Sequence, residues 1–383
     1  MLKNVRSGID NISQIDGFLK GKRLGFVGGA ASVSRSAVST IDILAGSYEL
    51  AALYGPEHGV RGDIQAGGKV ETYTDPKLGI PVYSIYGGNH RPAPEMLRGI
   101  DVMLVDLQEA SVRFYTFLYT LSHTMEACAR AGIPVVVPDR ITPLGGVEVA
   151  GTIIGAGFES FVGGYRLPTR IGLTIGEYAN YANDYLGLGC DLTVVPATGW
   201  DRAAYFDETD IPWVFPSPNL PTVDSCFAYV GTCVFEGVNV SEGRGTTKPF
   251  ELIGAPWLDA DALIANIAKC GAPGALLRKA YFTPTFSKYE KELCAGVQIH
   301  VTDRSACEPF RLGLLLLEEI GRLHPDKLEY LAYGEGDMAS YTIDKILGGD
   351  DFRLNRHDAE SLIRAHAPGV EAFRKEKEKY HLY

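Results

Sequence analysis

The stretch best equipped for chemistry is residues 53–62, which reads LYGPEHGVRG. It brings a carboxylate (Glu57), an imidazole (His58) and a guanidinium (Arg61) close together in the chain. A proline fixes φ before the carboxylate, and the glycines around it let the backbone approach a ligand closely. Glu57 in this frame is a candidate proton donor or nucleophile, with a polar surface turn as the alternative. His58 could orient Glu57 or contact substrate, or be a plain turn histidine.

Two further apolar runs, DVMLVDLQ and IPVVVPDR, also end in polar residues. The first run ends with Asp106 and Gln108, and the second with Asp139 and Arg140. An aspartate at the end of a buried strand must be paired, and we predict Arg113 as the partner of Asp106. A structural Asp–Arg pair and a role in substrate binding both stay open for Asp106, and the same holds for Asp139 and Arg140.

The later part of the chain holds a second polar cluster, in FEGVNVSEGRGT. It carries Glu236, Asn239, Glu242 and Arg244 without helix or strand periodicity, and polar loops of this kind often carry function. The alternative is an internally hydrogen-bonded structural loop. Asn219 stands between prolines in PSPNLPT, either as a preorganised amide or as part of a connector.

The elements that must position these residues follow an alternating pattern over the first 145 residues or so. We predict strands at 22–29, 48–55, 81–87, 101–108 and 133–140, and helices at 36–47, 94–100 and 114–132, the last ending at a C-cap glycine. Near-continuous apolar strands between helices indicate a parallel sheet covered on both faces. The fold class is therefore α/β, with a Rossmann-like doubly wound domain over residues 1–150. Ligands of such sheets bind beyond the carboxyl ends of the strands, where the polar residues fall.

The remainder, residues 151–383, is predicted as a smaller α+β domain. A helix over 173–187 opens with a capping box of Thr174 and Glu177. Further expected elements are strands at 191–200 and 294–303, a helix at 309–325 and a helical tail at 349–366. The Lys/Glu alternation at 374–379 indicates the solvated end of a helix.

The sequence lacks the motifs that mark several classes of protein function. The sequence holds no GxGxxG, GxxxxGK[ST], GxSxG or HExxH, which argues against a nicotinamide cofactor, a P-loop nucleotide site, a hydrolase nucleophile elbow and a zincin. We predict no metal and no cofactor. The net charge of −11 without a basic cluster argues against nucleic acid as a partner.

Cysteine usage and hydropathy favour the cytoplasm, with a secreted or periplasmic location as the alternative if a signal segment was removed. The seven cysteines are dispersed, without CxxC spacing, and are expected as buried small hydrophobic residues. No secretory signal is visible near the start, and no run approaches a membrane span, so no membrane partner is expected.

After these exclusions, the candidate functional groups are carboxylates together with arginines, amides and aromatic residues. Hydrolysis of a glycosidic bond needs a carboxylic acid to protonate the leaving oxygen, and a second anionic group or a substrate group as nucleophile or base. Arginine and asparagine side chains can hold anionic or N-acetyl substituents.

Taken in order, these segments resemble one family. The segments are LYGPEHGVRG, YTDPKLGIPVYSIYG, PEMLRGIDVMLVDLQ, RFYTF, VVVPDR, LTIGE, PSPNLPT and FEGVNVSEGRGTTKPFELIGAPW, and they resemble the NamZ-type exo-β-N-acetylmuramidases of glycoside hydrolase family 171, over roughly residues 20–380. The resemblance implies a Rossmann-like domain joined to a smaller α/β domain, with the site in the cleft between them. It also implies exo-cleavage of terminal β-1,4-linked N-acetylmuramic acid from peptidoglycan fragments or muropeptides, without a redox cofactor or obligatory metal, and with Glu57 as the catalytic carboxylate.

The sequence departs from this family at several positions. Ala150 stands where the family usually has a glutamate, with Glu148 two residues earlier, and Ile171 stands where a histidine is usual. VGGAAS replaces the usual Thr-Asn segment after the first strand, and Ile-Thr-Pro follows Arg140 in place of Pro-Asn-Pro. Three readings therefore stay open: an amino-sugar glycosidase, a glycosidase of different specificity, and a sugar-binding protein without catalysis.

The predicted site has two groups of residues. Glu57 and His58 are the catalytic candidates, and the candidates for binding substrate are Arg61, Asp106, Gln108, Arg113, Asp139, Arg140, Asn219, Asn239, Glu242 and Arg244. An arginine facing the lactyl carboxylate of muramic acid would supply specificity, because a guanidinium can bind a carboxylate through two parallel hydrogen bonds.

Overall fold

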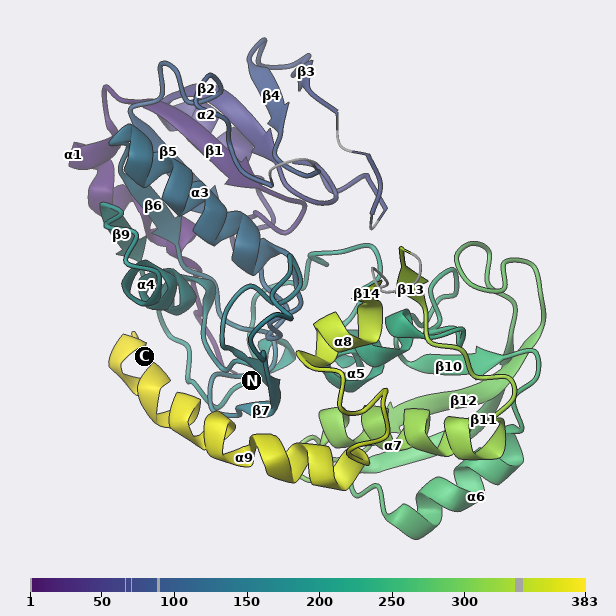
Figure 1. The fold of residues 1–383 in the computed structure, drawn as a ribbon. Helices are drawn as coiled ribbons and strands as arrows, with labels where there is room; N and C mark the ends of the chain where they lie inside the picture. Colours follow the sequence, from purple (N-terminus) through teal and green to yellow (C-terminus); the bar gives the residue numbers. More distant parts are fainter. Residues whose placement is uncertain (1, 66, 70, 88–89, 335–339) are drawn as a thin grey trace.

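The protein has two parts, each built around its own sheet (Figure 1). The computed structural model describes every residue except 1, 66, 70, 88–89 and 335–339. A seven-stranded sheet organises the first part and a three-stranded antiparallel sheet the second. Helix α9 (Ala359–Glu376) runs from the second part back to the first (Figure 1).

The large sheet has the strand order β3-β4-β2-β1-β5-β6-β9. Its strands are β1 (Arg23–Gly28), β2 (Glu49–Gly55), β3 (Tyr73–Thr74), β4 (Pro81–Ser84), β5 (Val102–Asp106), β6 (Val135–Pro138) and β9 (Leu192–Val195). Every pairing in it is parallel except that of the edge strand β3 with β4. The chain reverses direction across the sheet at β1, as in a doubly wound fold, so the predicted α/β class is confirmed.

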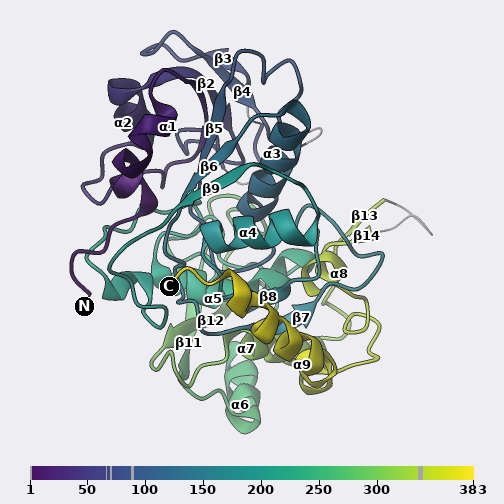
Figure 2. The same ribbon diagram turned by 90° about the vertical axis from the view of Figure 1, so that its left-hand side faces the viewer.

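Helices cover both faces of this sheet (Figures 1 and 2). On one face lie η1 (Gly8–Ile15), α1 (Asp16–Leu19) and α2 (Thr40–Ser47), and on the other α3 (Phe117–Ala131) and α4 (Ile175–Tyr185). Along β5, Val102 and Leu104 pack in the apolar cluster on the face of η1, α1 and α2. Met103 and Val105 pack in the cluster on the face of α3 and α4. This alternation explains the continuous apolar run in the sequence, because both faces of the strand are buried.

Two predicted helix signals are confirmed. Helix α3 ends at Gly132, which adopts a left-handed conformation with φ 67°. Helix α4 opens with the capping box of Thr174 and Glu177. The segment 94–100, expected as a helix, forms turns instead. It is bounded by prolines and by Gly99 at φ 80°, which leaves too few residues to offset helix nucleation.

The second part packs helices on a small antiparallel sheet. Its sheet order is β10-β12-β11, and its elements are α5 (Val223–Thr232), η3 (Cys233–Gly237), β10 (Leu252–Ala255), α6 (Ala260–Cys270), β11 (Ala275–Phe282), β12 (Cys294–Val301), α7 (Pro309–Leu323) and α8 (Thr342–Leu347). Helices α5 and α7 cross at Gly231 and Gly313. A Cβ at Gly231 would lie 1.8 Å from the Pro309 carbonyl oxygen, so only glycine permits this packing.

Six further short elements are present in the described part of the chain. These are η2 (Phe206–Glu208), the pair β7 (Ala150–Ile153) and β8 (Pro168–Arg170), and the pair β13 (Ala332–Tyr333) and β14 (Ser340–Tyr341), with η5 (Lys377–Tyr380) following α9. None of the described helices is long and apolar enough to cross a membrane. Six of the cysteines are buried and Cys270 is exposed, which largely confirms the expected role as small core residues.

The C-terminal segment fastens the second part to the first. The Leu382 amide donates to Glu177 at 2.8 Å, and the Tyr383 hydroxyl donates to Asp139 at 2.7 Å. Lys377 donates to the carbonyls of Gly146 and Gly172 at 2.6 and 2.9 Å and is buried. The prediction of a fully solvated run at 374–379 is therefore wrong at Lys377, because the helix end is docked rather than free.

The sheet of the first part extends past residue 150, the predicted domain boundary. Strand β9 pairs with β6 through Val135↔Leu192 and Pro138↔Val195, so the sheet of the first part extends to residue 195. Helix α4 covers the same sheet. Strand periodicity finds β9 in the sequence but gives no information on which sheet it joins.

Glu109, just after β5, makes stability depend on pH. Its Oε1 is buried without a hydrogen-bond partner, Oε2 accepts from the Ser111 amide, and burial raises the pKa of this carboxyl to about 8 from 4.5. The folded state thus holds its proton up to about pH 8, whereas the unfolded chain releases it near pH 4.5, and stability falls between these values. We predict that Glu109→Gln removes this loss. Between pH 6 and 8 the variant should gain about 2 kcal/mol in free energy of unfolding relative to wild type.

Urea unfolding at pH 6, 7 and 8 measures this difference. Glu95→Gln, at an exposed turn position, is the matched control and should follow wild type. If the free energy of unfolding changed with pH equally in Glu109→Gln and in wild type, the Glu109 carboxyl would have an ordinary pKa, against this prediction.

Candidate active site

The loop after β2 places Glu57 beyond the carboxyl edge of the sheet. The Gly59 amide donates to the Pro56 carbonyl at 2.9 Å, and His58 and Gly59 are both left-handed, with φ 73° and 75°. A non-glycine residue in this region is uncommon, and such strain concentrates at functional sites. At Gly62 a Cβ would lie 2.3 Å from the Cβ of Ala30, so glycine lets this loop pack on the loop that follows β1.

Three donors hold the carboxylate of Glu57. The Thr116 hydroxyl donates to Oε2 at 2.7 Å, and the Tyr86 hydroxyl and the Gly67 amide donate to Oε1 at 3.1 and 3.0 Å. These donors come from three segments: the start of α3, the end of β4 and the loop after β2. All three are neutral, so they orient the carboxylate without forming an ion pair, and Glu57 stays half-buried.

His58 lies beside this carboxylate and is buried. Its Nδ1 is 2.8 Å from the Ile64 carbonyl oxygen, so the neutral ring carries its proton on Nδ1 and leaves Nε2 as an acceptor. Burial lowers the pKa of His58; Glu57 opposes this shift and the cation of Arg244 adds to it. The imidazole is therefore neutral at pH 7, and Arg244 of the second part lies close enough to act on it.

The loop after η3 contributes a charged network from the second part. Arg244 pairs with Glu236 at 2.5 Å and with Glu242 at 3.1 Å, and Lys288 pairs with Glu242 at 2.8 Å. Burial alone would raise the pKa of Glu242, but Lys288 and Arg244 together hold it below its usual range. The side chain of Glu236 is 28% exposed against 3% for Glu242, so Glu236 is the carboxylate of this network that solvent reaches.

Asn219 lies beside the loop that carries Glu57. Its amide Nδ2 lies 3.5 Å from Oε1 of Gln65, which belongs to the segment following Glu57. Of the predicted residues, the structure thus brings together Glu57, His58, Asn219, Glu242 and Arg244.

Asp106 and Arg140 form a buried pair beneath this region. Arg140 Nε and Nη2 lie 2.5 and 2.8 Å from the two oxygens of Asp106, and Thr40 donates a third bond at 2.6 Å. Arg113, predicted as the partner of Asp106, is instead fully buried elsewhere. It donates to the backbone carbonyls of Thr152, Leu167 and Ile346, and burial lowers its pKa to about 10.

The other predicted binding residues also make internal contacts. Asp139 accepts from the Gly176 amide and the Thr174 hydroxyl, both at 2.7 Å, and burial raises its pKa to about 6. The remaining contacts are those of Gln108 with the carbonyls of Glu109 and Ile141, of Asn239 with the backbone of Lys327 and Glu329, and of Arg61 with Asp75. These interactions hold the fold around the site.

Sequence reasoning missed four side chains of the site. Tyr86 and Thr116 hold Glu57, and Lys288 pairs with Glu242. The Tyr115 hydroxyl is buried without a hydrogen-bond partner. Burial raises its pKa, and the charge of Glu57 adds to this rise. Tyr86 lies within SIYG and Tyr115 and Thr116 within RFYTF, so two of the family-like segments contained the signal. Among the described residues, no cluster of three or more His, Cys, Asp or Glu side chains could hold a metal ion.

Two positions that depart from the family pattern, Ala150 and Ile171, lie outside this group. Ala150 is in β7 and lines a cavity with Arg170, and Ile171 is buried in the apolar core. Glu148, also on that cavity, does not replace a group beside Glu57.

The parallel sheet of the first part presents an oriented carboxylate to a charged loop of the second part. These features define a two-domain α/β protein with a carboxylate-centred polar site. More particularly, the chain belongs to the exo-β-N-acetylmuramidase NamZ family: the N-terminal family model matches residues 24–224 and the C-terminal model residues 227–383. We propose that the domain boundary lies between these two matches rather than at residue 150.

Similar proteins cover almost the whole chain. A curated relative, the peptidoglycan β-N-acetylmuramidase NamZ of Bacillus subtilis, is 44% identical over 99% of this chain and 91% of its own. Two crystal structures of DUF1343 family proteins from Bacteroides fragilis cover 99% of both chains, one at 33% identity with a TM-score of 0.88 and one at 26% with 0.76.

The roles of Asp106 and Arg140 can be tested by removing one partner. We predict that Arg140→Ala lowers the free energy of unfolding by about 3–5 kcal/mol, because it leaves a buried carboxylate unpaired. The double variant Asp106→Leu/Arg140→Met should recover most of this loss. Urea unfolding measures both effects, and an Arg140→Ala protein with normal stability but weakened substrate binding would assign the pair to the substrate instead.

Proposed function

We propose that this protein is a glycoside hydrolase that removes β-1,4-linked N-acetylmuramic acid from the ends of peptidoglycan fragments. The observation that carries the proposal is the full-length similarity to the B. subtilis peptidoglycan β-N-acetylmuramidase, at 44% identity. The oriented carboxylate of Glu57 supplies the chemistry that such a reaction needs.

Glu57 is the proposed acid or nucleophile of the reaction. Thr116 and Tyr86 fix its orientation. Oε2 accepts a hydrogen bond from Thr116 and keeps a lone pair for a proton or for a bond toward the substrate. Glu236 is the proposed second carboxylate, since it is the more exposed acidic group of the Arg244 network. A substrate group could replace it, as in other glycosidases that use substrate assistance.

Arg244 is the proposed contact for the lactyl carboxylate of muramic acid. Of the predicted arginines, Arg113 and Arg140 are buried in internal contacts and Arg61 pairs with Asp75. Arg244 keeps 18% of its side chain exposed while its ion pairs hold it in place. The unpartnered Tyr115 hydroxyl is a further donor available to the sugar.

The alternatives are a sugar-binding protein without catalysis and a glycosidase of other specificity. Ala150 and Ile171 are the reason to consider the first. Their location on a separate cavity and in the core favours an intact Glu57 site, and thus the enzyme.

Release of free sugar from a chromogenic β-N-acetylmuramide tests the proposal. We predict turnover by wild type and a loss of about 10²–10⁴-fold in kcat for Glu57→Gln, because the amide can neither protonate the leaving group nor attack. Glu71→Gln, an exposed carboxylate later in the same region of the chain, is the matched control and should keep wild-type rates.

The outcomes separate the alternatives. Near-wild-type turnover by Glu57→Gln, with its fold intact by circular dichroism, would remove Glu57 from the chemistry. Calorimetric binding of muropeptides without turnover by wild type would favour the sugar-binding protein. Preference for another sugar within a panel of nitrophenyl glycosides would favour a different specificity.

A further inference from the structure

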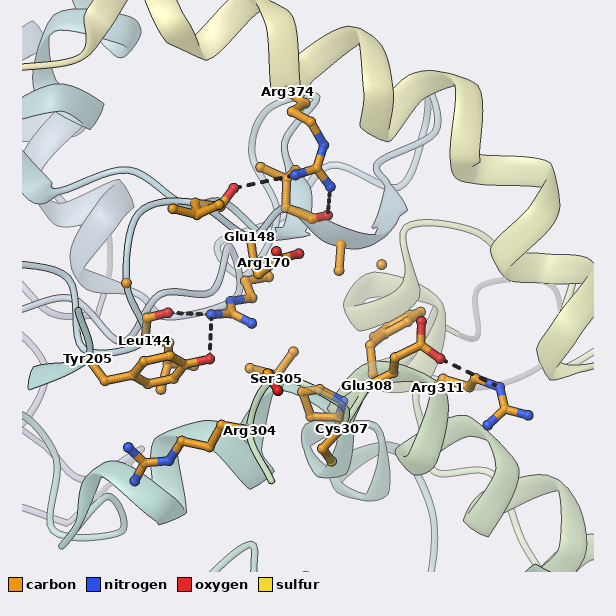
Figure 3. A pocket seen from close by; sticks show the side chains of 18 of the residues that line it. Leu144, Glu148, Arg170, Tyr205, Arg304, Ser305, Cys307, Glu308, Arg311 and Arg374 are labelled. Atoms are coloured by element: carbon orange, nitrogen blue, oxygen red, sulfur yellow. Dashed lines mark hydrogen bonds and ion pairs between the residues drawn. The ribbon is translucent and has the colours of Figure 1, made fainter. Parts of the chain in front are cut away.

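A cavity of about 520 Å³ lies between the two parts, away from the residues around Glu57 (Figure 3). Its walls come from the segment 144–151, from Arg170 at the end of β8, from the start of α7 and from α9. Cavities of this size commonly hold small organic ligands.

Arg170 is a buried cation in this cavity without a carboxylate partner. The residue is 5% exposed, its Nη2 donates to the Leu144 carbonyl and to the Tyr205 hydroxyl, and its Nε is buried with no hydrogen-bond partner. No ion pair connects it to any carboxylate in the described part of the chain. In Figure 3 its guanidinium extends into the cavity, between Tyr205 and Ser305. A buried charge without a partner is costly, so this guanidinium is prepared for an anion.

Ala150 leaves the space in which that anion would lie. It is the register partner of Arg170 in the antiparallel pair β7–β8, and both residues line the cavity. Directly opposed residues of such a pair project to the same face of the sheet, about 4.5–5.5 Å apart at Cβ. Ala150 and Arg170 therefore project toward the same cavity, and the methyl group of Ala150 fills little of it.

The other arginines on the cavity wall already have partners. Arg304 pairs with Asp207 and Asp224 at 2.7 Å, and Arg311 pairs with Glu360 at 2.6 Å. Arg374 donates to the carbonyls of Val147 and Val149 at 3.4 and 3.0 Å. Arg170 is thus the cation that a ligand would neutralise.

The side chains that line the cavity also limit the charge and polarity of a ligand that could bind there. Glu148 and Glu308 line the cavity and would repel a dianion such as a phosphate monoester about twice as strongly as a monocarboxylate. The remaining wall is largely apolar, with Leu144, Val149, Val230, Phe310 and Ile363. A planar carboxylate matches the geometry of a guanidinium, and an apolar body matches these side chains.

We propose that this cavity is a second ligand site, for an organic monocarboxylate with an apolar body whose carboxylate pairs with Arg170. The proposal is independent of the glycosidase function, because none of the residues that hold Glu57 line this cavity. A ligand here would contact both parts of the protein beneath α9 and so stabilise their junction.

Titration with sodium hexanoate tests the proposal, with binding measured by isothermal calorimetry at constant ionic strength. We expect saturable binding of hexanoate, and binding of hexanol and of inorganic phosphate weaker by at least about tenfold, the factor that a charge-assisted pair supplies. Glu57→Gln should bind hexanoate as wild type does, which separates this cavity from the proposed active site.

Ala150→Glu is the decisive variant, because it places a carboxylate of the protein itself opposite Arg170. We expect it to abolish hexanoate binding and to raise the melting temperature, whereas Ala150→Gln, of equal size but neutral, should not raise the melting temperature. Saturable hexanoate binding retained by Ala150→Glu, equal affinity for hexanol and hexanoate, or no saturable binding by wild type would each overturn the proposal.

Discussion

Pairing of buried charges at the carboxyl edge of the parallel sheet is the constraint on which the rest of the structure depends. The second part and the C-terminal segment cover this edge, so each charge there loses water and must find a partner. Asp106 forms an ion pair with Arg140. Asp139 accepts hydrogen bonds from the Gly176 amide and from the hydroxyls of Thr174 and Tyr383. Glu57 differs from both, since it is half-buried and held by neutral donors, which leaves its charge available for chemistry.

The junction between the two parts follows from the same constraint. Glu177 and Asp139 of the first part receive Leu382 and Tyr383 at the C-terminus, and Lys377 reaches two carbonyls near β7 and β8. These contacts hold α9 over the cavity that contains Arg170 (Figures 1 and 3). The region around Glu57 and this cavity therefore share one junction while using separate residues.

Much of the fold could be predicted from the sequence, because apolar periodicity and caps are local signals. The strands of the sheet, the Gly132 cap and the capping box at Thr174 are of this kind. The helix expected at 94–100 was wrong, because turn geometry depends on tertiary context. The sheet also extends beyond the predicted boundary at residue 150, because the sequence does not show that β9 pairs with β6. Motifs in the sequence pointed to the loop of Glu57 and to the residues of the Arg244 network, whose roles stay a prediction. The partner of Asp106 could not be predicted, because the pairing joins residues 34 positions apart. Arg113 shows the same limit, since sequence alone does not distinguish an arginine at a site from one fully buried among backbone carbonyls.

The most direct test of the central claim, that Glu57 is the reacting carboxyl group, is a crystal structure of Glu57→Gln with a disaccharide that carries a terminal β-N-acetylmuramic acid. The account predicts that the residue 57 side chain lies at the scissile bond, about 2.6–3.2 Å from the glycosidic oxygen or facing the anomeric carbon. It also predicts Tyr86 and Thr116 beside residue 57, and the Arg244 network on the opposite side of the sugar. A sugar bound with residue 57 more than about 10 Å from the glycosidic bond would contradict it, because no carboxyl group acts in this chemistry from that distance.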